Sequence, residues 1–218
     1  MRFFLIIACA VAALQPVAAQ NLEIENLENL VFPNFQESVV KLKTGKVYQA
    51  VLNYEKTEQQ MVVLRNHELY LFRDNQLVDT IFMGDRVFVP AETGFYEVLV
   101  NEPLALFIQH KAKLENTGAT LAYGSKTNTA GVTHINKIFS QDGAIKLKVP
   151  ENFKVVDDSG YLLRVDGQIQ KITNRKQFLK LFPDKGKEIE DYLSKNNTDF
   201  KSAEDLKALV KFCNGISR

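Results

Sequence analysis

Short apolar runs of period two, separated by turn-forming residues about every eight to twelve positions, dominate residues 38–113. Thr44-Gly45-Lys46 lies between two such runs, and Asn66-His67 lies between the next two. No helical segments alternate with these strands, which disfavours a doubly wound parallel sheet. We therefore expect an antiparallel β-rich body, built as a sandwich, a barrel or a meander.

The same strand pattern continues to residue 172, with one interruption. Residues 77–83, 87–90, 95–101 and 104–113 are expected strands, and strands resume near 132–139 and 144–149. Between them, residues 115–130 form a predicted polar surface loop. In residues 151–172 we expect two β-hairpins, with turns at Asp157-Asp158-Ser159-Gly160 and at Asp166-Gly167.

From residue 173 the apolar period becomes helical. A first helix ends before Pro183, Asp184 can cap a second, and Ser202 with Asp205 forms a capping box for a third. Gly215 is expected at the C-terminal cap of that third helix. The chain is thus predicted to be α+β, with a small C-terminal tail of two to three short helices.

The first twenty residues have the layout of a secretory signal peptide. Arg2 gives a positive start, and residues 3–14 are an unbroken run of apolar and small residues. This run is shorter than the roughly 20 residues that a membrane span needs. We expect a signal peptide at residues 1–19, cleaved between Ala19 and Gln20. Residues 20–36 would then be an N-terminal arm, and residues 37–150 the β-rich domain.

Cleavage leaves 199 residues, enough for one substantial domain or a domain with an appendage. It also removes Cys9 and leaves Cys213, so the exported chain has no intramolecular disulfide. Cys213 lies on the apolar stripe of the third predicted helix and is expected to be a buried core thiol.

The formal net charge of +1 conceals two oppositely charged halves. Residues 20–110 hold 7 basic and 13 acidic residues, and residues 111–218 hold 19 and 13. Scattered charges favour an ordinary solvated surface. Self-association through the two halves, or contact with an envelope protein, remains an alternative. The near-neutral charge and the signal peptide disfavour nucleic-acid binding.

No catalytic, cofactor-binding or metal-binding motif occurs in the chain. His67, His110 and His134 lack the paired spacing of a zinc site, and the sequence does not show whether they converge in the fold. The Asp157-Asp158 pair lacks the ligand set of a calcium loop, so a turn is the favoured interpretation. No phosphate loop, dinucleotide fingerprint or nucleophile elbow is present.

Two polar corners are weak candidates for a ligand site. Asp85 and Arg86 follow Gly84 in a turn, where Arg86 can serve as an anion fork, although a local Asp–Arg interaction is the commoner arrangement. Tyr123, Ser125 and Lys126 lie in the predicted polar loop, a poor setting for a reactive Ser–Lys pair.

Several segments carry a resemblance to a known group of proteins. They are Thr44-Gly45-Lys46, Leu52-Asn53-Tyr54, Asp85-Arg86-Val87-Phe88, Phe95-Tyr96-Glu97-Val98-Leu99, Ala122-Tyr123-Gly124-Ser125 and the segment 178–185. From about Val39 to Cys213 the chain resembles a family of exported proteins of the Bacteroidota whose function is unknown. The resemblance implies a periplasmic or cell-surface location and supplies no active-site residues.

These observations favour a non-enzymatic exported protein that serves as a binding or structural module of the bacterial cell envelope. The alternative is a periplasmic enzyme or small-ligand carrier whose site is assembled only in three dimensions. A deep pocket that holds one of the histidines beside carboxylates would favour this alternative.

Overall fold

A computed structural model describes residues 27–72, 74–117, 119–120, 126–127, 138–139, 145–146 and 153–216. The predicted signal peptide and its cleavage site at Ala19 and Gln20 lie outside these residues, as do Tyr123, Ser125 and His134. Among the helices of the described residues, none is long and apolar enough to cross a membrane.

The body is one antiparallel sheet, as the alternating pattern predicts. Its ten longer strands are β1 (Gln36–Leu42), β2 (Val47–Glu55), β3 (Gln60–Arg65), β4 (Glu68–Leu71), β5 (Val78–Met83), β6 (Arg86–Pro90), β7 (Phe95–Val100), β8 (Ala105–Gln109), β15 (Gly160–Val165) and β16 (Gln168–Ile172). The order is β12-β13-β4-β3-β2-β1-β5-β6-β7-β8-β15-β16, with the two-residue strands β12 (Ile138–Phe139) and β13 (Ile145–Lys146) at one edge.

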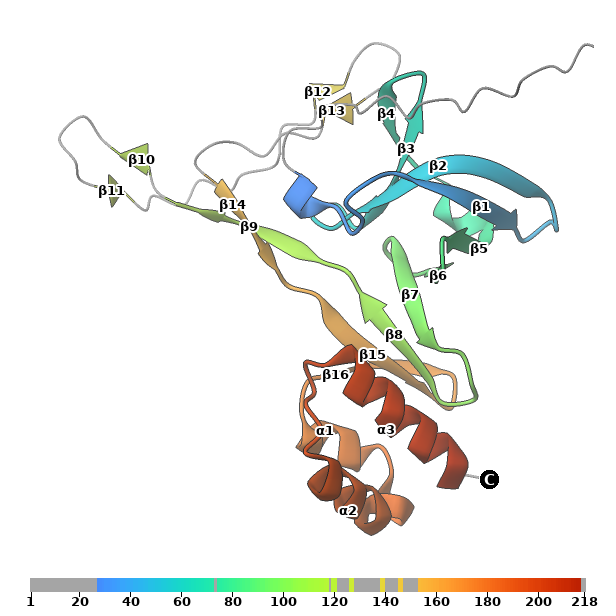
Figure 1. Cartoon of the computed structure of the whole chain (residues 1–218), viewed down its shortest axis with the longest axis vertical. Helices are drawn as coiled ribbons and strands as arrows, with labels where there is room; N and C mark the ends of the chain where they lie inside the picture. The colour runs from blue at the N-terminus through green and yellow to red at the C-terminus, as the bar shows by residue number, and fades with distance from the viewer. Residues whose placement is uncertain are drawn as a thin grey trace, which may run out of the picture.

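The C-terminal residues form the expected helical tail, which confirms the α+β class. The helices are α1 (Arg175–Lys180), α2 (Gly186–Asn196) and α3 (Ala203–Ile216), and single 3-10 turns occur at η1 (Leu27–Asn29), η2 (Asn75–Leu77) and η3 (Pro183–Lys185). Figure 1 shows the three helices gathered beside β8, β15 and β16, away from β1 and β2.

The ends of these helices match the predicted caps in part. Ser202 Oγ accepts from the Asp205 backbone N–H at 3.2 Å, which confirms the first half of the capping box. The reciprocal bond is replaced, because the Ser202 N–H donates to the Asp199 carbonyl and the Asp205 carboxylate accepts from the Asp199 N–H. Asn197, at φ 49°, ends α2 in the left-handed conformation. Two caps are wrong: Lys185, rather than Asp184, occupies the N-cap of α2, and Gly215 lies inside α3.

The hairpin predicted at residues 157–160 is wrong, because the strands on its two sides pair with different partners. The expected strand 104–113 breaks at His110 and Lys111 into β8 and β9 (Ala112–Asn116). β14 (Phe153–Asp157) pairs with β9, whereas β15 pairs with β8. The residues around Asp158 therefore form a bend in a long two-stranded ribbon, not a hairpin turn (Figure 1).

The second predicted hairpin is confirmed. β15 and β16 pair across Asp166 and Gly167, whose φ angles of 49° and 77° are those that a tight two-residue turn requires. Beyond β9, the short strands β10 (Ala119–Thr120) and β11 (Lys126–Thr127) pair with each other within the expected polar loop.

Two large hydrophobic cores and two small clusters share this sheet in the described residues. The helical core joins the helices to β7, β8, β15 and β16, and its buried residues are Val100, Leu104, Leu106, Leu163, Ile172, Phe178, Ile189, Leu193, Leu206, Leu209, Val210 and Cys213. The body core is built from β1, β2, β3, β5, β6 and β7, and its buried residues are Val40, Leu52, Tyr54, Met61, Val78, Ile81, Met83, Phe88 and Phe95. β7 contributes Phe95 to the body core and Val100 to the helical core, so one strand links the two.

Candidate ligand-binding cavity

A cavity of about 620 Å³ lies where the N-terminal arm, the bend of the long ribbon and the helical tail approach one another. Ligand pockets in proteins are commonly about 300–1,000 Å³, so the space suits a small molecule. Its lining residues are Leu30, Val31, Lys56, Arg86, Ile108, His110, Asp157, Ser159, Gly160, Tyr161, Lys171, Ile172, Thr173, Phe200 and Lys201.

The arm, residues 27–35, is fixed to β2 by hydrogen bonds. The Val31 N–H donates to the Tyr54 carbonyl at 3.0 Å. The Asn53 side chain accepts from the Phe32 N–H at 3.1 Å and donates to the Phe32 carbonyl at 2.8 Å. Asn53 is fully buried. Its side-chain amide bonds to the N–H and the carbonyl of Phe32, as a neighbouring β-strand would do. The arm thus forms a fixed wall of the cavity.

A cluster of three charged or titratable side chains borders the cavity, and two of them, Arg86 and His110, line it. Arg86 begins β6, Glu97 lies in β7 and His110 follows β8. Arg86 Nε donates to Glu97 Oε1 at 2.7 Å, and Arg86 Nη2 donates to Glu97 Oε2. His110 Nε2 lies 2.5 Å from Glu97 Oε2 and 2.9 Å from Arg86 Nη2. The bidentate ion pair fixes both partners in one geometry.

The electrostatics of this cluster favour an ionised Glu97. Burial by itself raises the pKa of the Glu97 carboxyl, but hydrogen bonds from His110 and Arg86, together with the charge of Arg86, lower it below its usual value. His110 Nε2 faces an acceptor, Glu97 Oε2, and a donor, Arg86 Nη2. A protonated Nε2 can bond to Glu97, and an unprotonated Nε2 can accept from Arg86.

Aromatic rings enclose the cluster on the side of the body core. The Arg86 guanidinium lies over Phe32, 4.5 Å from the ring centroid, and 5.6 Å from the centroid of Phe88. The His110 ring meets Tyr54 edge-on with centroids 6.1 Å apart. Rings at such distances attract a guanidinium through their negative faces. These contacts hold the Arg86 guanidinium beside the cavity.

The bend in the ribbon supplies the next part of the lining. Ser159 Oγ donates to Asp157 Oδ1 at 2.8 Å and accepts from the Lys111 N–H at 3.2 Å. This serine bridges the two bent strands at the position where the chain leaves the sheet. It accepts from the Lys111 N–H, which has no strand partner because the break between β8 and β9 falls at this residue.

Three lysines around the cavity lack an ion-pair partner in the described part of the chain. They are Lys56, Lys171 and Lys201, and within the described residues no carboxylate oxygen lies within 4 Å of their ammonium groups. Arg86 is neutralised by Glu97, which leaves Asp157 as the remaining carboxylate of the described lining. The lining therefore carries excess positive charge.

The missing side chain of Gly160 leaves room for the end of the Lys171 side chain. A Cβ atom on Gly160 would lie 3.0 Å from Lys171 Cε and 3.4 Å from Lys171 Nζ. The lysine chain therefore crosses directly over the glycine backbone at the cavity. A larger residue at position 160 would displace the end of this side chain.

The structure places one of the predicted site residues, Arg86, at the cavity and the others elsewhere or outside the described residues. Arg86 lines the cavity, but the expected local pairing with Asp85 is wrong, because Arg86 pairs with Glu97 and His110 instead. Tyr123 and Ser125 fall outside the described residues, and Lys126 lies in β11. Of the histidines, His110 lines the cavity, while His67 occupies an exposed hairpin tip at φ 62°.

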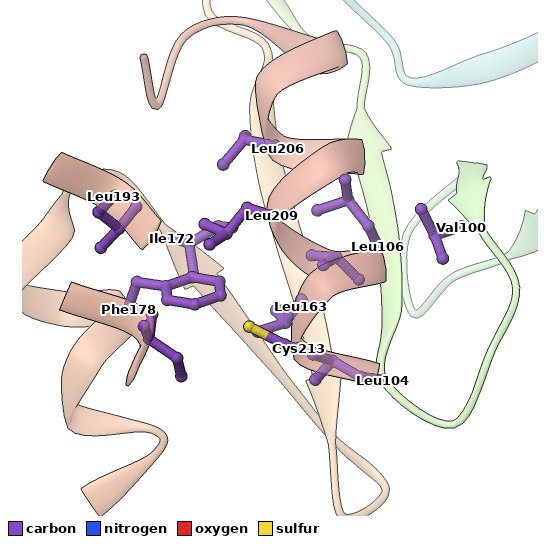
Figure 2. Packing of buried hydrophobic residues seen from close by; sticks show 12 residues of the cluster. Val100, Leu104, Leu106, Leu163, Ile172, Phe178, Leu193, Leu206, Leu209 and Cys213 are labelled. Carbon is purple, nitrogen blue, oxygen red and sulfur yellow. The ribbon is translucent and has the colours of Figure 1, made fainter. Parts of the chain in front are cut away.

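Metal and thiol chemistry find no support in the residues described. In the described residues, no three His, Cys, Asp or Glu side chains lie together in a way that could hold a metal ion. Cys213 is fully buried in the helical core, and burial raises the pKa of its thiol to about 12. Figure 2 shows its sulfur among Leu163, Leu104 and Phe178, as expected of a core thiol.

A buried carboxyl that sequence reasoning missed organises the turn beside the arm. Glu55 is fully buried and accepts from Asn29 Nδ2 and the Thr57 N–H at 3.0 Å each, and from the Glu58 N–H at 2.6 Å. Burial raises the pKa of Glu55, and hydrogen bonds from the Thr57 hydroxyl, the Glu58 N–H and the Thr57 N–H offset part of that rise. Because Glu55 holds both the arm and the turn that carries Lys56, it positions two parts of the lining.

We compared the chain with protein families, with curated proteins and with solved structures, and found no match. The cavity is therefore interpreted from its own chemistry, and the resemblance to exported Bacteroidota proteins stays a prediction.

Proposed function

We propose that this protein is an exported, non-enzymatic binding module of the bacterial cell envelope, which holds a small ligand in the cavity. The observation that carries the proposal is the cavity itself, about 620 Å³ in volume and lined by residues from the arm, the sheet and the helical tail. It combines apolar walls with a few fixed polar groups, the composition typical of ligand sites. The signal-peptide pattern of residues 1–19 supports export.

His110 lines the cavity beside the Glu97 carboxylate, the arrangement that favours a periplasmic enzyme or small-ligand carrier, and the hydrogen bonds of the residues around the cavity favour a carrier. Glu97 uses both carboxyl oxygens on Arg86 and His110, and its side chain is 8% exposed. Ser159 bonds to Asp157 and Lys111, and no hydrogen bond joins it to His110 among the described residues. A nucleophile needs a base within hydrogen-bond reach. This arrangement suits a site that orients a ligand.

A dye-binding experiment tests the proposal. The probes are 1-anilinonaphthalene-8-sulfonate (the anionic dye) and N-phenyl-1-naphthylamine (the neutral dye), which share one ring system. The variant Ile108→Trp fills the cavity from β8, and Ile169→Trp is its matched control on the exposed edge strand β16, where Ile169 is 46% exposed. Far-ultraviolet circular dichroism and thermal unfolding establish that both variants fold.

We expect saturable binding of at least one dye at one site per chain, lost in Ile108→Trp and kept in Ile169→Trp. If neither dye binds saturably to the wild-type protein, or if Ile108→Trp binds as well as the control, the cavity is not a ligand site. Export is tested separately by intact mass of the protein purified from its native envelope. A chain that begins at Gln20 supports export, and an unprocessed chain contradicts it.

A further inference from the structure

Resting on the proposed function, we infer that the ligand is a small amphiphilic anion: an apolar body that carries one carboxylate, sulfonate or phosphate group. Two separate features of the lining point to this class, a set of cations without ion-pair partners in the described residues and a set of apolar side chains in the same lining. Neither feature alone would define the ligand.

The cationic feature consists of lysines from three elements distant in sequence. Lys56 lies in the turn after β2, Lys171 in β16 and Lys201 in the loop between α2 and α3. Within the described residues none of the three makes a side-chain hydrogen bond or an ion pair, and what sets them apart from other surface lysines is their place around one cavity. Like charges gathered around a concave site repel one another, and a bound anion relieves that repulsion.

Arg86 does not belong to this set, because Glu97 already neutralises it. Asp157 is the carboxylate that opposes the lysines, and its Oδ1 accepts a hydrogen bond from Ser159. With three lysines against one carboxylate, the described lining keeps a net positive charge with His110 neutral. A single anionic group on the ligand would suit this excess.

The apolar feature comes from the arm and the helical side. Leu30 and Val31 contribute from the arm, Ile108 from β8 and Phe200 from the loop before α3. Tyr161 presents its ring while its hydroxyl donates to the Lys201 carbonyl at 3.2 Å. This bond ties the apolar wall to the loop that carries one of the lysines. An inorganic ion would leave these apolar groups in contact with water, whereas an amphiphile would cover them.

The two dyes separate the charge requirement from the cavity itself. We expect the anionic dye to bind at least about tenfold more tightly than the neutral dye, with the preference falling as salt concentration rises. The double variant Lys171→Gln/Lys201→Gln should weaken binding of the anionic dye about tenfold and leave the neutral dye unchanged. Its matched control is Lys187→Gln/Lys195→Gln on α2, whose two lysines are exposed and outside the lining.

Gly160→Ala provides a variant that keeps every charge. The added methyl group contacts the end of Lys171, which must shift by a few tenths of an ångström, so the anionic dye should bind slightly more weakly and the neutral dye unchanged. Sodium decanoate and sodium phosphate, added as competitors, distinguish an amphiphile from a free anion. We expect decanoate to displace the anionic dye at concentrations where phosphate does not.

Each result has a distinct meaning. If both dyes bind equally in the cavity and the lysine variants change nothing, the ligand class is wrong and the proposed function survives. Displacement by phosphate as effective as that by decanoate overturns the amphiphile and leaves an inorganic anion. If neither dye binds the wild-type protein, the proposed function and the ligand class fall together.

Discussion

At the scale of single residues, Glu97 is the centre of the charged cluster. It accepts from Arg86 through both oxygens and contacts His110 Nε2, with little exposure to water. Removing the charge of such a carboxylate leaves Arg86 without its partner. Hydrogen bonds to charged groups contribute about 1.5–3 kcal/mol each, so this residue matters to stability as well as to the site.

We predict that Glu97→Gln lowers the free energy of unfolding by about 2–3 kcal/mol at pH 7. Because the pKa of Glu97 is lowered in the folded state, its stabilisation is present above the usual carboxyl pKa of 4.5 and disappears as the pH falls through the lowered value. Urea denaturation of wild type and variant from pH 7 to pH 3 measures this. The difference in free energy of unfolding between wild type and Glu97→Gln should shrink toward acid pH. A difference that stays constant would show that an ionised Glu97 is not its source. Glu37→Gln, on an exposed position of β1, is the control.

A second prediction concerns Cys213. The thiol is fully buried and its pKa is raised by burial to about 12, so its reactive thiolate is scarce at neutral pH. A disulfide reagent such as DTNB should react with this residue at the rate of unfolding in the folded protein and at once in urea. Cys213→Ser places a hydroxyl in the helical core and should cost about 1–3 kcal/mol of stability. Rapid labelling of the folded chain would show that the thiol is accessible.

At the scale of elements, α3 is held to the sheet by packing and by one buried amide. Asn214 Oδ1 accepts from the Leu104 N–H at 3.0 Å, and its Nδ2 donates to the Leu104 carbonyl at 2.9 Å. Asn214 and Leu104 are 110 residues apart. The amide fixes the register of the last helix against the turn between β7 and β8, which apolar packing alone would leave less precise.

Asn214→Ala should therefore destabilise the fold by about 2–4 kcal/mol, because it leaves two buried backbone groups without partners. The control Asn196→Ala removes an exposed amide that bonds within α2 to the Tyr192 carbonyl, and should change stability by less than about 0.5 kcal/mol. Chemical denaturation followed by circular dichroism compares the two. Equal effects of both changes would refute the docking role of Asn214.

At the scale of the whole molecule, two cores lie along one continuous sheet. Phe88 is fully buried in the body core and Phe178 in the helical core. Since β7 carries Phe95 in the first core and Val100 in the second, separating the cores requires breaking a strand. The cavity lies near the junction of the cores, so its shape depends on both.

Phe88→Ala and Phe178→Ala should each lower stability by about 3–5 kcal/mol, the usual cost of removing a buried phenyl ring. In both variants, unfolding should remain one transition when circular dichroism and tyrosine fluorescence are followed in the same denaturant series. Two separated transitions in either variant would show that the helical tail and the body unfold as independent units.

Much of the fold can be predicted from sequence because its signals are local. Alternating apolar residues and the Asn66-His67 and Asp166-Gly167 turns specify strands and tight hairpins, and Ser202 with Asp205 specifies the start of α3. The same local reading fails at Asp157–Gly160. A polar, glycine-containing segment fits both a hairpin turn and a bend in a ribbon, and the choice depends on pairing with β8 and β9, which are remote in sequence.

The candidate site follows the same division. Arg86 is recognisable as a polar group beside a turn, whereas His110 falls inside the expected strand 104–113. Nothing near either residue in sequence identifies Glu97 as their common partner. The cavity lysines are missed because each looks like an ordinary surface charge. By itself, the sequence determined the α+β class, the buried thiol and the expectation of export, all of which rest on short-range patterns. The tertiary structure alone decided the cavity, because its walls come from segments that meet only when the sheet, the arm and the helices pack together.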